Sequence, residues 1–145
     1  MKTAMLTWQF WALMAAVFAA LTAIFAKIGV EGVNSDLATF IRTLVILAIV
    51  TLIVSATGQW RGMADIGSRT VFFLVLSGLA TGASWLCYFR ALQMGDAARV
   101  APIDKLSVVL VALFATVFLG EKLSLTGWLG IALIAAGTIL IAVRA

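Results

Sequence analysis

Five long apolar stretches occupy almost the whole chain, and the segments between them are too short to form a separate structure. Each stretch is about 20 residues long, which is the length that an α-helix needs to cross a hydrocarbon core of about 30 Å. They cover residues 7–28, 37–56, 71–92, 100–119 and 125–143. Membrane-spanning β-strands need only about half this length. The sequence therefore predicts an all-α integral membrane protein with five transmembrane helices.

The composition supports this prediction and excludes several classes of protein. The chain is 64% hydrophobic and 11% charged, whereas ordinary soluble domains carry about 25% charged residues. We expect one transmembrane domain over residues 1–145, in contact with the lipid bilayer. The chain has no His and Cys87 is its sole Cys, so we expect no metal and no cofactor. The net charge of +4 is spread over short loops, which is typical of membrane anchors and not of nucleic-acid binding.

Charged residues inside the apolar stretches are the first functional candidates, because an ionisable group in a bilayer is expensive. Arg42 lies about five residues inside the second stretch, and Asp104 and Lys105 lie about four or five residues inside the fourth. Both stretches begin on the same side of the membrane, so these charges lie at a similar depth of about 6–8 Å. Arg90 leaves the third stretch near this layer. We predict that these four residues face the interior of the helix bundle.

Two interpretations of this cluster stay open. An ion pair between Arg42 and Asp104 would neutralise both groups and be purely structural. Alternatively, the surplus of three cations over one acid faces an anionic or carboxylate-bearing ligand. Pro102 has two interpretations as well. It is a harmless first residue if a helix begins there, and otherwise it kinks the helix and frees carbonyls beside the charges.

The third stretch carries one polar stripe along nearly its whole length. Its members recur at steps of four, three and four, and they are Ser77, Thr81, Ser84 and Tyr88. Trp85 and Phe89 flank the stripe, and Trp11 of the first stretch is a further candidate for an apolar wall. This pattern suits a water-accessible path for an amphipathic solute. The alternative is that the hydroxyls bond to carbonyls of their own helix.

Positive charge is evenly divided between the two sides of the membrane. The N-terminal side carries Lys2, Arg61, Arg69 and Lys122, and the opposite side carries Lys27, Arg90, Arg99 and Arg144. Four against four, or four against three if Arg90 is counted as intramembrane, gives no preferred orientation. Either other features set the orientation, or the chain inserts both ways. Small residues of the last stretch, Gly130, Ala136 and Gly137, are the preferred candidates for a subunit contact.

Three motifs in a fixed order resemble an EamA-type unit of the drug/metabolite transporter superfamily. They are the Y-F-R-A-L exit of the third stretch within residues 87–102, the G-E-K-L-S turn that begins with Gly120 and Glu121, and the glycine-bearing last stretch around residues 127–137. Arg42 matches the arginine of the family's second helix. The resemblance covers essentially the whole chain.

The resemblance implies a function and an assembly. Family members are usually ten-helix exporters built from two such units in inverted orientation, so this chain resembles half of that fold. The missing half would be a second copy, which implies a homodimer, antiparallel if the chain has dual topology. The implied function is secondary export of a small metabolite or drug-like solute by alternating access in a bacterial inner membrane, and the protein would not be an enzyme. A membrane scaffold or accessory subunit without transport activity is the alternative.

Overall fold

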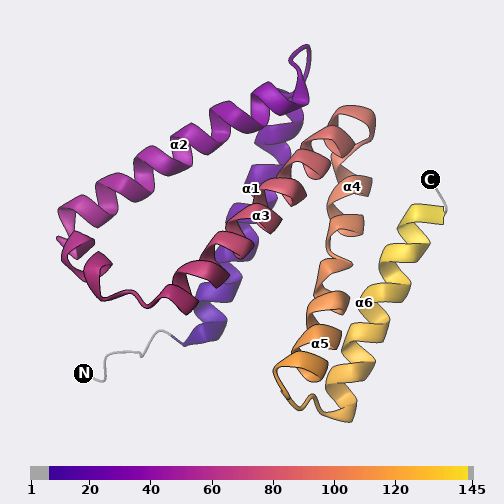
Figure 1. Ribbon diagram of the computed structural model, residues 1–145. Helices are drawn as coiled ribbons and strands as arrows, with labels where there is room; N and C mark the ends of the chain where they lie inside the picture. The colour runs from indigo at the N-terminus through magenta and orange to yellow at the C-terminus, as the bar shows by residue number, and fades with distance from the viewer. Residues whose placement is uncertain (1–6, 144–145) are drawn as a thin grey trace, which may run out of the picture. The chain divides into compact units, whose positions relative to one another are not determined.

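The computed structural model describes residues 7–143, and this part of the chain is entirely helical (Figure 1). Its elements are α1 (Trp8–Gly29), α2 (Ser35–Ala56), the short 3₁₀ helix η1 (Gln59–Asp65), α3 (Ser68–Met94), α4 (Ala97–Asp104), α5 (Ser107–Phe118) and α6 (Leu125–Val143). Five segments are long and apolar enough to cross a membrane, and α4 and α5 together form the fourth. The predicted fold of five transmembrane helices is therefore confirmed.

The fourth span differs from the prediction because it is not one continuous helix. Its helix begins at Ala97 and contains Pro102 in its interior, so Pro102 is not the first helical residue. Proline has no N–H and its ring crowds the preceding turn, which disrupts the regular hydrogen-bond pattern. The backbone then tightens: the N–H of Lys105 donates to the Pro102 carbonyl at 3.0 Å, and the N–H of Leu106 donates to the Ile103 carbonyl at 3.0 Å. The break between α4 and α5 follows directly.

The contacts within the chain define two compact units. The first comprises residues up to Phe25 together with residues from Gly95 onward, and the second comprises Ala26–Met94. The second unit thus holds the end of α1, all of α2, η1 and α3. We refer to it as the α2–α3 unit and to the other as the α4–α6 unit. The expectation of one membrane domain over residues 1–145 stays a prediction.

In the α2–α3 unit, the two long helices are antiparallel and converge where α2 begins and α3 ends (Figure 1). Asn34 starts α2: its side-chain oxygen accepts hydrogen bonds from the backbone N–H groups of Asp36 and Leu37, which satisfies donors that a helix start leaves free. The packed core lies at this convergent end. Val30 and Leu92 are completely buried, at 1% and 0% exposure.

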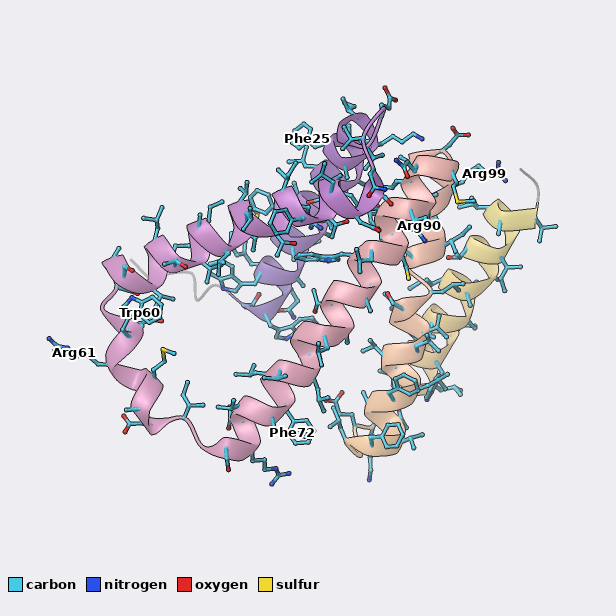
Figure 2. All side chains as sticks on the ribbon, turned by 45° about the horizontal axis from the view of Figure 1, so that its top comes forward. Phe25, Trp60, Arg61, Phe72, Arg90 and Arg99 are labelled. Carbon is cyan, nitrogen blue, oxygen red and sulfur yellow. The ribbon has the colours of Figure 1, made fainter. Side chains whose placement is uncertain are left out.

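Toward η1 the two helices diverge, and side chains there are exposed. Figure 2 shows Arg61 extending away from η1, and it labels Trp60 and Phe72 in the same region. The indole N–H of Trp60 donates to the Ser55 hydroxyl at 3.0 Å, which ties η1 to the end of α2. Large apolar side chains such as Phe72 are more than half exposed. In a helix of this length and hydropathy, such surface contacts lipid.

In the α4–α6 unit, α6 packs against both α4 and α5. The tight turn between α5 and α6 contains Gly120, whose φ of +69° is left-handed, a conformation that only glycine adopts at little cost. The N–H of Glu121 then donates back to the Ala115 carbonyl at 3.2 Å. Ser124 caps α6 by accepting a hydrogen bond from the N–H of Gly127 at 3.1 Å. The Gly120–Glu121 motif therefore forms the structural turn between two neighbouring helices.

Candidate functional site

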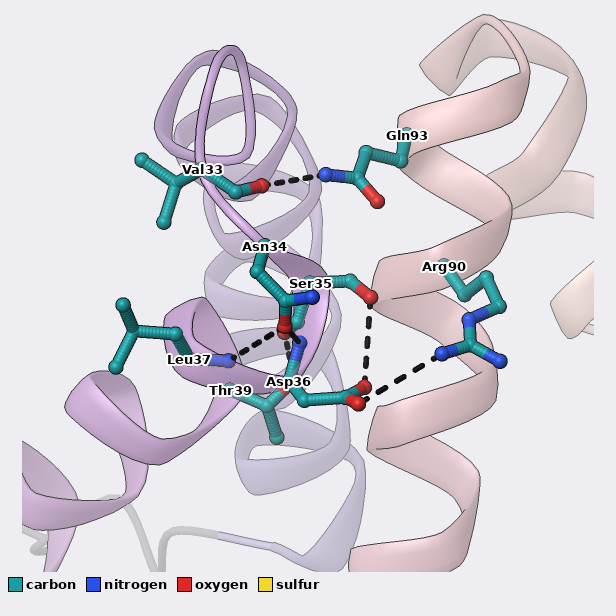
Figure 3. A network of polar contacts seen from close by, with 8 residues as sticks. All are labelled: Val33, Asn34, Ser35, Asp36, Leu37, Thr39, Arg90 and Gln93. Atoms are coloured by element: carbon teal, nitrogen blue, oxygen red, sulfur yellow. Dashed lines mark hydrogen bonds and ion pairs between the residues drawn. The ribbon is translucent and has the colours of Figure 1, made fainter.

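A ladder of polar contacts joins the converging ends of α2 and α3. The Arg90 guanidinium lies 3.6 Å from the Asp36 carboxylate (Figure 3). One helical turn further along α3, the Gln93 amide donates to the carbonyl of Val33, in the turn before α2. The Lys27 ammonium at the end of α1 donates to the Leu92 carbonyl at 2.8 Å. This last contact satisfies a carbonyl that the end of α3 would otherwise leave free.

Arg42 lies further along α2 than Asp36, where α2 again contacts α3. Its guanidinium carbon lies 4.0 Å from the centroid of the Trp85 ring and 5.3 Å from that of Phe89. A guanidinium over an aromatic face is attracted by the negative face of the ring. Tyr88, half-buried on α3, lies near Arg42. Arg42 itself is half-buried.

The cations near this ladder differ in whether they have an acidic partner. Arg90 is paired with Asp36, and in the other unit Lys105 is paired with Asp104 at 3.0 Å. Within the α2–α3 unit, no carboxylate lies at ion-pairing distance from Arg42. In this unit Arg42 is therefore held by aromatic rings and has no acidic partner.

A shallow pocket opens beside the ladder. It is lined by Asp36, Leu86, Cys87 and Arg90, so the ion pair forms its polar wall. Cys87 is exposed and is not part of a disulfide. Within the described part of the chain, no three His, Cys, Asp or Glu side chains are grouped so that they could hold a metal ion.

The structure brings together part of the predicted set. Arg42, Trp85, Tyr88 and Arg90 all lie along the α2–α3 contact. The remaining members of the stripe lie on α3 as exposed residues, namely Ser77, Thr81 and Ser84. The Thr81 hydroxyl donates to the Ser77 carbonyl at 2.8 Å. At this residue the hydroxyl therefore bonds to a carbonyl of its own helix. Whether the stripe lines a solute path stays a prediction.

The other predicted residues lie in the α4–α6 unit, and their roles stay predictions. Asp104 and Lys105 lie at the break between α4 and α5, where Asp104 is half-buried and Lys105 is exposed. Trp11 lies on α1 with an exposed ring. On α6, Gly130 is half-buried and Ala136 and Gly137 are exposed. An ion pair between Arg42 and Asp104, and a joint cluster of the four charged residues, likewise stay predictions.

Sequence patterns alone gave Asp36 and Gln93 no role in the site, whereas Phe89 was expected only as an aromatic flank of the stripe. Asp36 looked like a loop residue because it precedes the apolar stretch, although α2 begins before it, at Ser35. Asp36 can be found by comparing how far residues of the two helices lie from the connection between them. In two antiparallel helices joined by a short connection, residues at similar distances from the connection lie opposite each other, and this pairs Asp36 with Arg90.

The family comparisons agree with the helical arrangement. The EamA-like transporter family matches residues 6–143. A protein from Sinorhizobium, described as "Uncharacterized transporter in cobO 3'region", is 66% identical over 137 residues, which cover 94% of this chain and 97% of the relative. No solved structure matches the chain.

Proposed function

Because this chain belongs to the EamA-like transporter family, we propose that it exports a small metabolite or drug-like solute by alternating access as a homodimer. Family membership and five apolar spans make it a multi-pass membrane protein with a transporter role. The solute class, the exporter direction and the dimer are our proposal. We also propose a bacterial inner membrane as its location, since the 66% identical relative is a Sinorhizobium protein.

The observation that carries the proposal is the placement of Arg42. A cation within a membrane-spanning helix is costly and marks a functional site by default. Here it lies against Trp85 and near Phe89, and no acid of the α2–α3 unit is paired with it, which supports a role in binding a ligand. A scaffold subunit needs only apolar helices and has no use for such a residue. We therefore take Arg42, Trp85 and Tyr88 as one end of the solute path, which would continue along Ser84, Thr81 and Ser77 of α3.

Assembly from two copies follows from the size of the unit. Inverted repeats about an axis in the membrane plane are how many secondary transporters expose one site alternately to each side. The 66% identical relative is itself about the length of one unit, because the aligned residues cover 97% of it. Two copies in opposite orientations would supply the repeat. We propose that they meet through the small residues of α6, Gly130, Ala136 and Gly137.

The test is reconstitution of the purified protein. Thermal unfolding in detergent, screened over a panel of small metabolites and drug-like solutes, should identify compounds that raise the unfolding temperature, because a ligand that binds the native state stabilises it. Those compounds should then be taken up or released by proteoliposomes that contain the protein and not by empty ones. Stabilising compounds that show no protein-dependent flux would contradict the transport proposal.

A further inference from the structure

Building on the proposed transport function, we propose that Arg42 is an anion-binding residue that selects an organic anion as the solute. Its guanidinium would hold the carboxylate or phosphate group, and the apolar body of the solute would lie against the half-buried rings of Trp85 and Tyr88 on α3. This assigns a ligand class to a site for which the family comparisons give none. The inference follows from how Arg42 is held.

First, the contact with Trp85 and the binding of a ligand would use different parts of the Arg42 guanidinium. The guanidinium carbon of Arg42 lies over the Trp85 ring, 4.0 Å from its centroid. The five N–H donors of arginine lie in the plane of the group and point outward from its edge, and the indole ring offers them no oxygen or nitrogen acceptor. The fork geometry that these donors form matches a carboxylate or phosphate in a two-point contact.

The second step concerns where these donors point. Among the residues of the α2–α3 unit, Arg42 makes no hydrogen bond with another residue. In the same part of the chain, no buried side-chain nitrogen or oxygen lacks a partner, so the N–H edge of Arg42 is not sealed inside the protein. The N–H edge is accessible and Trp85 lies against the guanidinium, whereas Phe89, 5.3 Å from the guanidinium carbon, is buried at 3% exposure and supports the group from within the protein.

The third step concerns charge. Asp36 and Arg90 form an ion pair, so this pair adds little net charge beside Arg42. An anionic ligand would neutralise the remaining cation and lower the cost of keeping it within the span. A cationic ligand would meet a like charge already fixed over the rings. The site therefore favours anions over neutral compounds and disfavours cations.

The experiment compares three probes that share one ring and differ in charge: benzoate, benzamide and benzylamine. Binding to the purified full chain is measured by thermal unfolding and by tryptophan fluorescence, with Trp85→Phe used to isolate the signal of Trp85. We expect benzoate to bind about tenfold or more tightly than benzamide, and benzylamine to bind most weakly. Salt should weaken benzoate binding. Equal binding of the three probes would overturn the inference.

Variants assign the preference to Arg42. Arg42→Gln should remove the preference for benzoate. Arg61→Gln, which removes a cation from exposed η1, should keep it. If Arg42→Gln does not fold, Arg42→Lys decides the matter, because lysine keeps the charge but loses the planar fork and the stacking. We expect it to bind benzoate several-fold more weakly. Wild-type affinity in Arg42→Lys or in folded Arg42→Gln would overturn the assignment.

Two further arms separate the source of the anion and the role of transport. In nanodiscs, replacing phosphatidylcholine by phosphatidylglycerol should leave benzoate binding unchanged. Competition by phosphatidylglycerol, with a change in Trp85 fluorescence, would assign the site to a lipid headgroup and overturn the solute assignment. Benzoate binding without flux of any solute would reject transport and keep the anion site. Flux of a neutral solute that is unaffected in Arg42→Gln would keep transport and reject the anion site.

Discussion

At the scale of single residues, the α2–α3 contact holds two cations in different ways. Arg90 has a carboxylate partner in Asp36, whereas Arg42 rests on aromatic rings. Arg42 could be identified from the sequence because a charge inside an apolar run is conspicuous. Its aromatic support could not, because the depth of a residue in a span does not give the rotation of its helix. Asp36 was missed for a related reason: hydropathy locates a span but does not give the register between two spans.

We expect the Asp36–Arg90 ion pair to contribute little to stability. The two side chains are 56% and 64% exposed, and an exposed pair of this kind contributes about 1 kcal/mol or less. A double-mutant cycle with Asp36→Asn and Arg90→Gln, followed by the free energy of unfolding, should therefore give a coupling energy below about 1 kcal/mol. Asp65→Asn, in exposed η1, is the control for loss of an acid. A coupling above about 3 kcal/mol is typical of a buried pair and would contradict this expectation.

At the scale of elements, length and hydropathy were sufficient to find all five spans, because the bilayer fixes the length of an apolar helix. The ends were less predictable: α3 continues to Met94, beyond the apolar stretch. The sequence predicted a break in the fourth span only if the helix begins before Pro102. Hydropathy does not locate this start, because Ala97 lies in a polar segment outside the apolar stretch.

The polar stripe of α3 should be accessible to water in the membrane. In a variant with Cys87→Ser, cysteines at Thr81 and Ser84 should react with a charged, membrane-impermeant thiol reagent in intact membranes. Leu79→Cys is the matched control, since Leu79 is 66% exposed but lies on the apolar side of the helix, where lipid would shield it. A solute found by thermal stabilisation should slow the reaction at Ser84. Equal reaction at all three positions, or reaction at Leu79 alone, would argue against a path along the stripe.

The interrupted fourth span should act as a flexible joint. Proline in a helix interior is about 3 kcal/mol less favourable than alanine, and interrupted helices carry solute and ion sites in many transporters. Pro102→Ala should therefore raise the unfolding temperature and slow solute flux in proteoliposomes, because a continuous helix resists bending at Asp104 and Lys105. Val111→Ala improves helix propensity in α5 without changing the break. If both variants lower flux equally, the break has no special role.

At the scale of the whole molecule, the sequence and the structure both describe one unit of a transporter. Family membership establishes the transporter role, and the described residues hold five helices long and apolar enough to cross a membrane. The sequence analysis reached the family through the order of its motifs. It could not reach the assembly, because subunit contacts between apolar helices use the same small residues that also serve ordinary packing.

The final prediction is that the protein inserts in both orientations and works as an antiparallel dimer. Lys and Arg are balanced between the two sides of the protein, four against four in the sequence. Neither side is therefore strongly favoured to remain in the cytoplasm. Adding two positive charges to one side should lock the orientation. Gln59→Lys with Ala64→Lys adds them in η1, and Glu31→Lys with Ala98→Lys adds them on the opposite side.

Each locked variant expressed alone should lose transport, because two copies in the same orientation cannot form the inverted repeat. Co-expression of the two locked variants should restore it. The matched control is Gln59→Ser with Ala64→Ser, which changes the same positions without adding charge and should keep both orientations and full activity. Orientation is measured by labelling a single cysteine near each end from one side of the membrane. Full activity of a fully locked variant expressed alone would show that a parallel dimer or a monomer is sufficient.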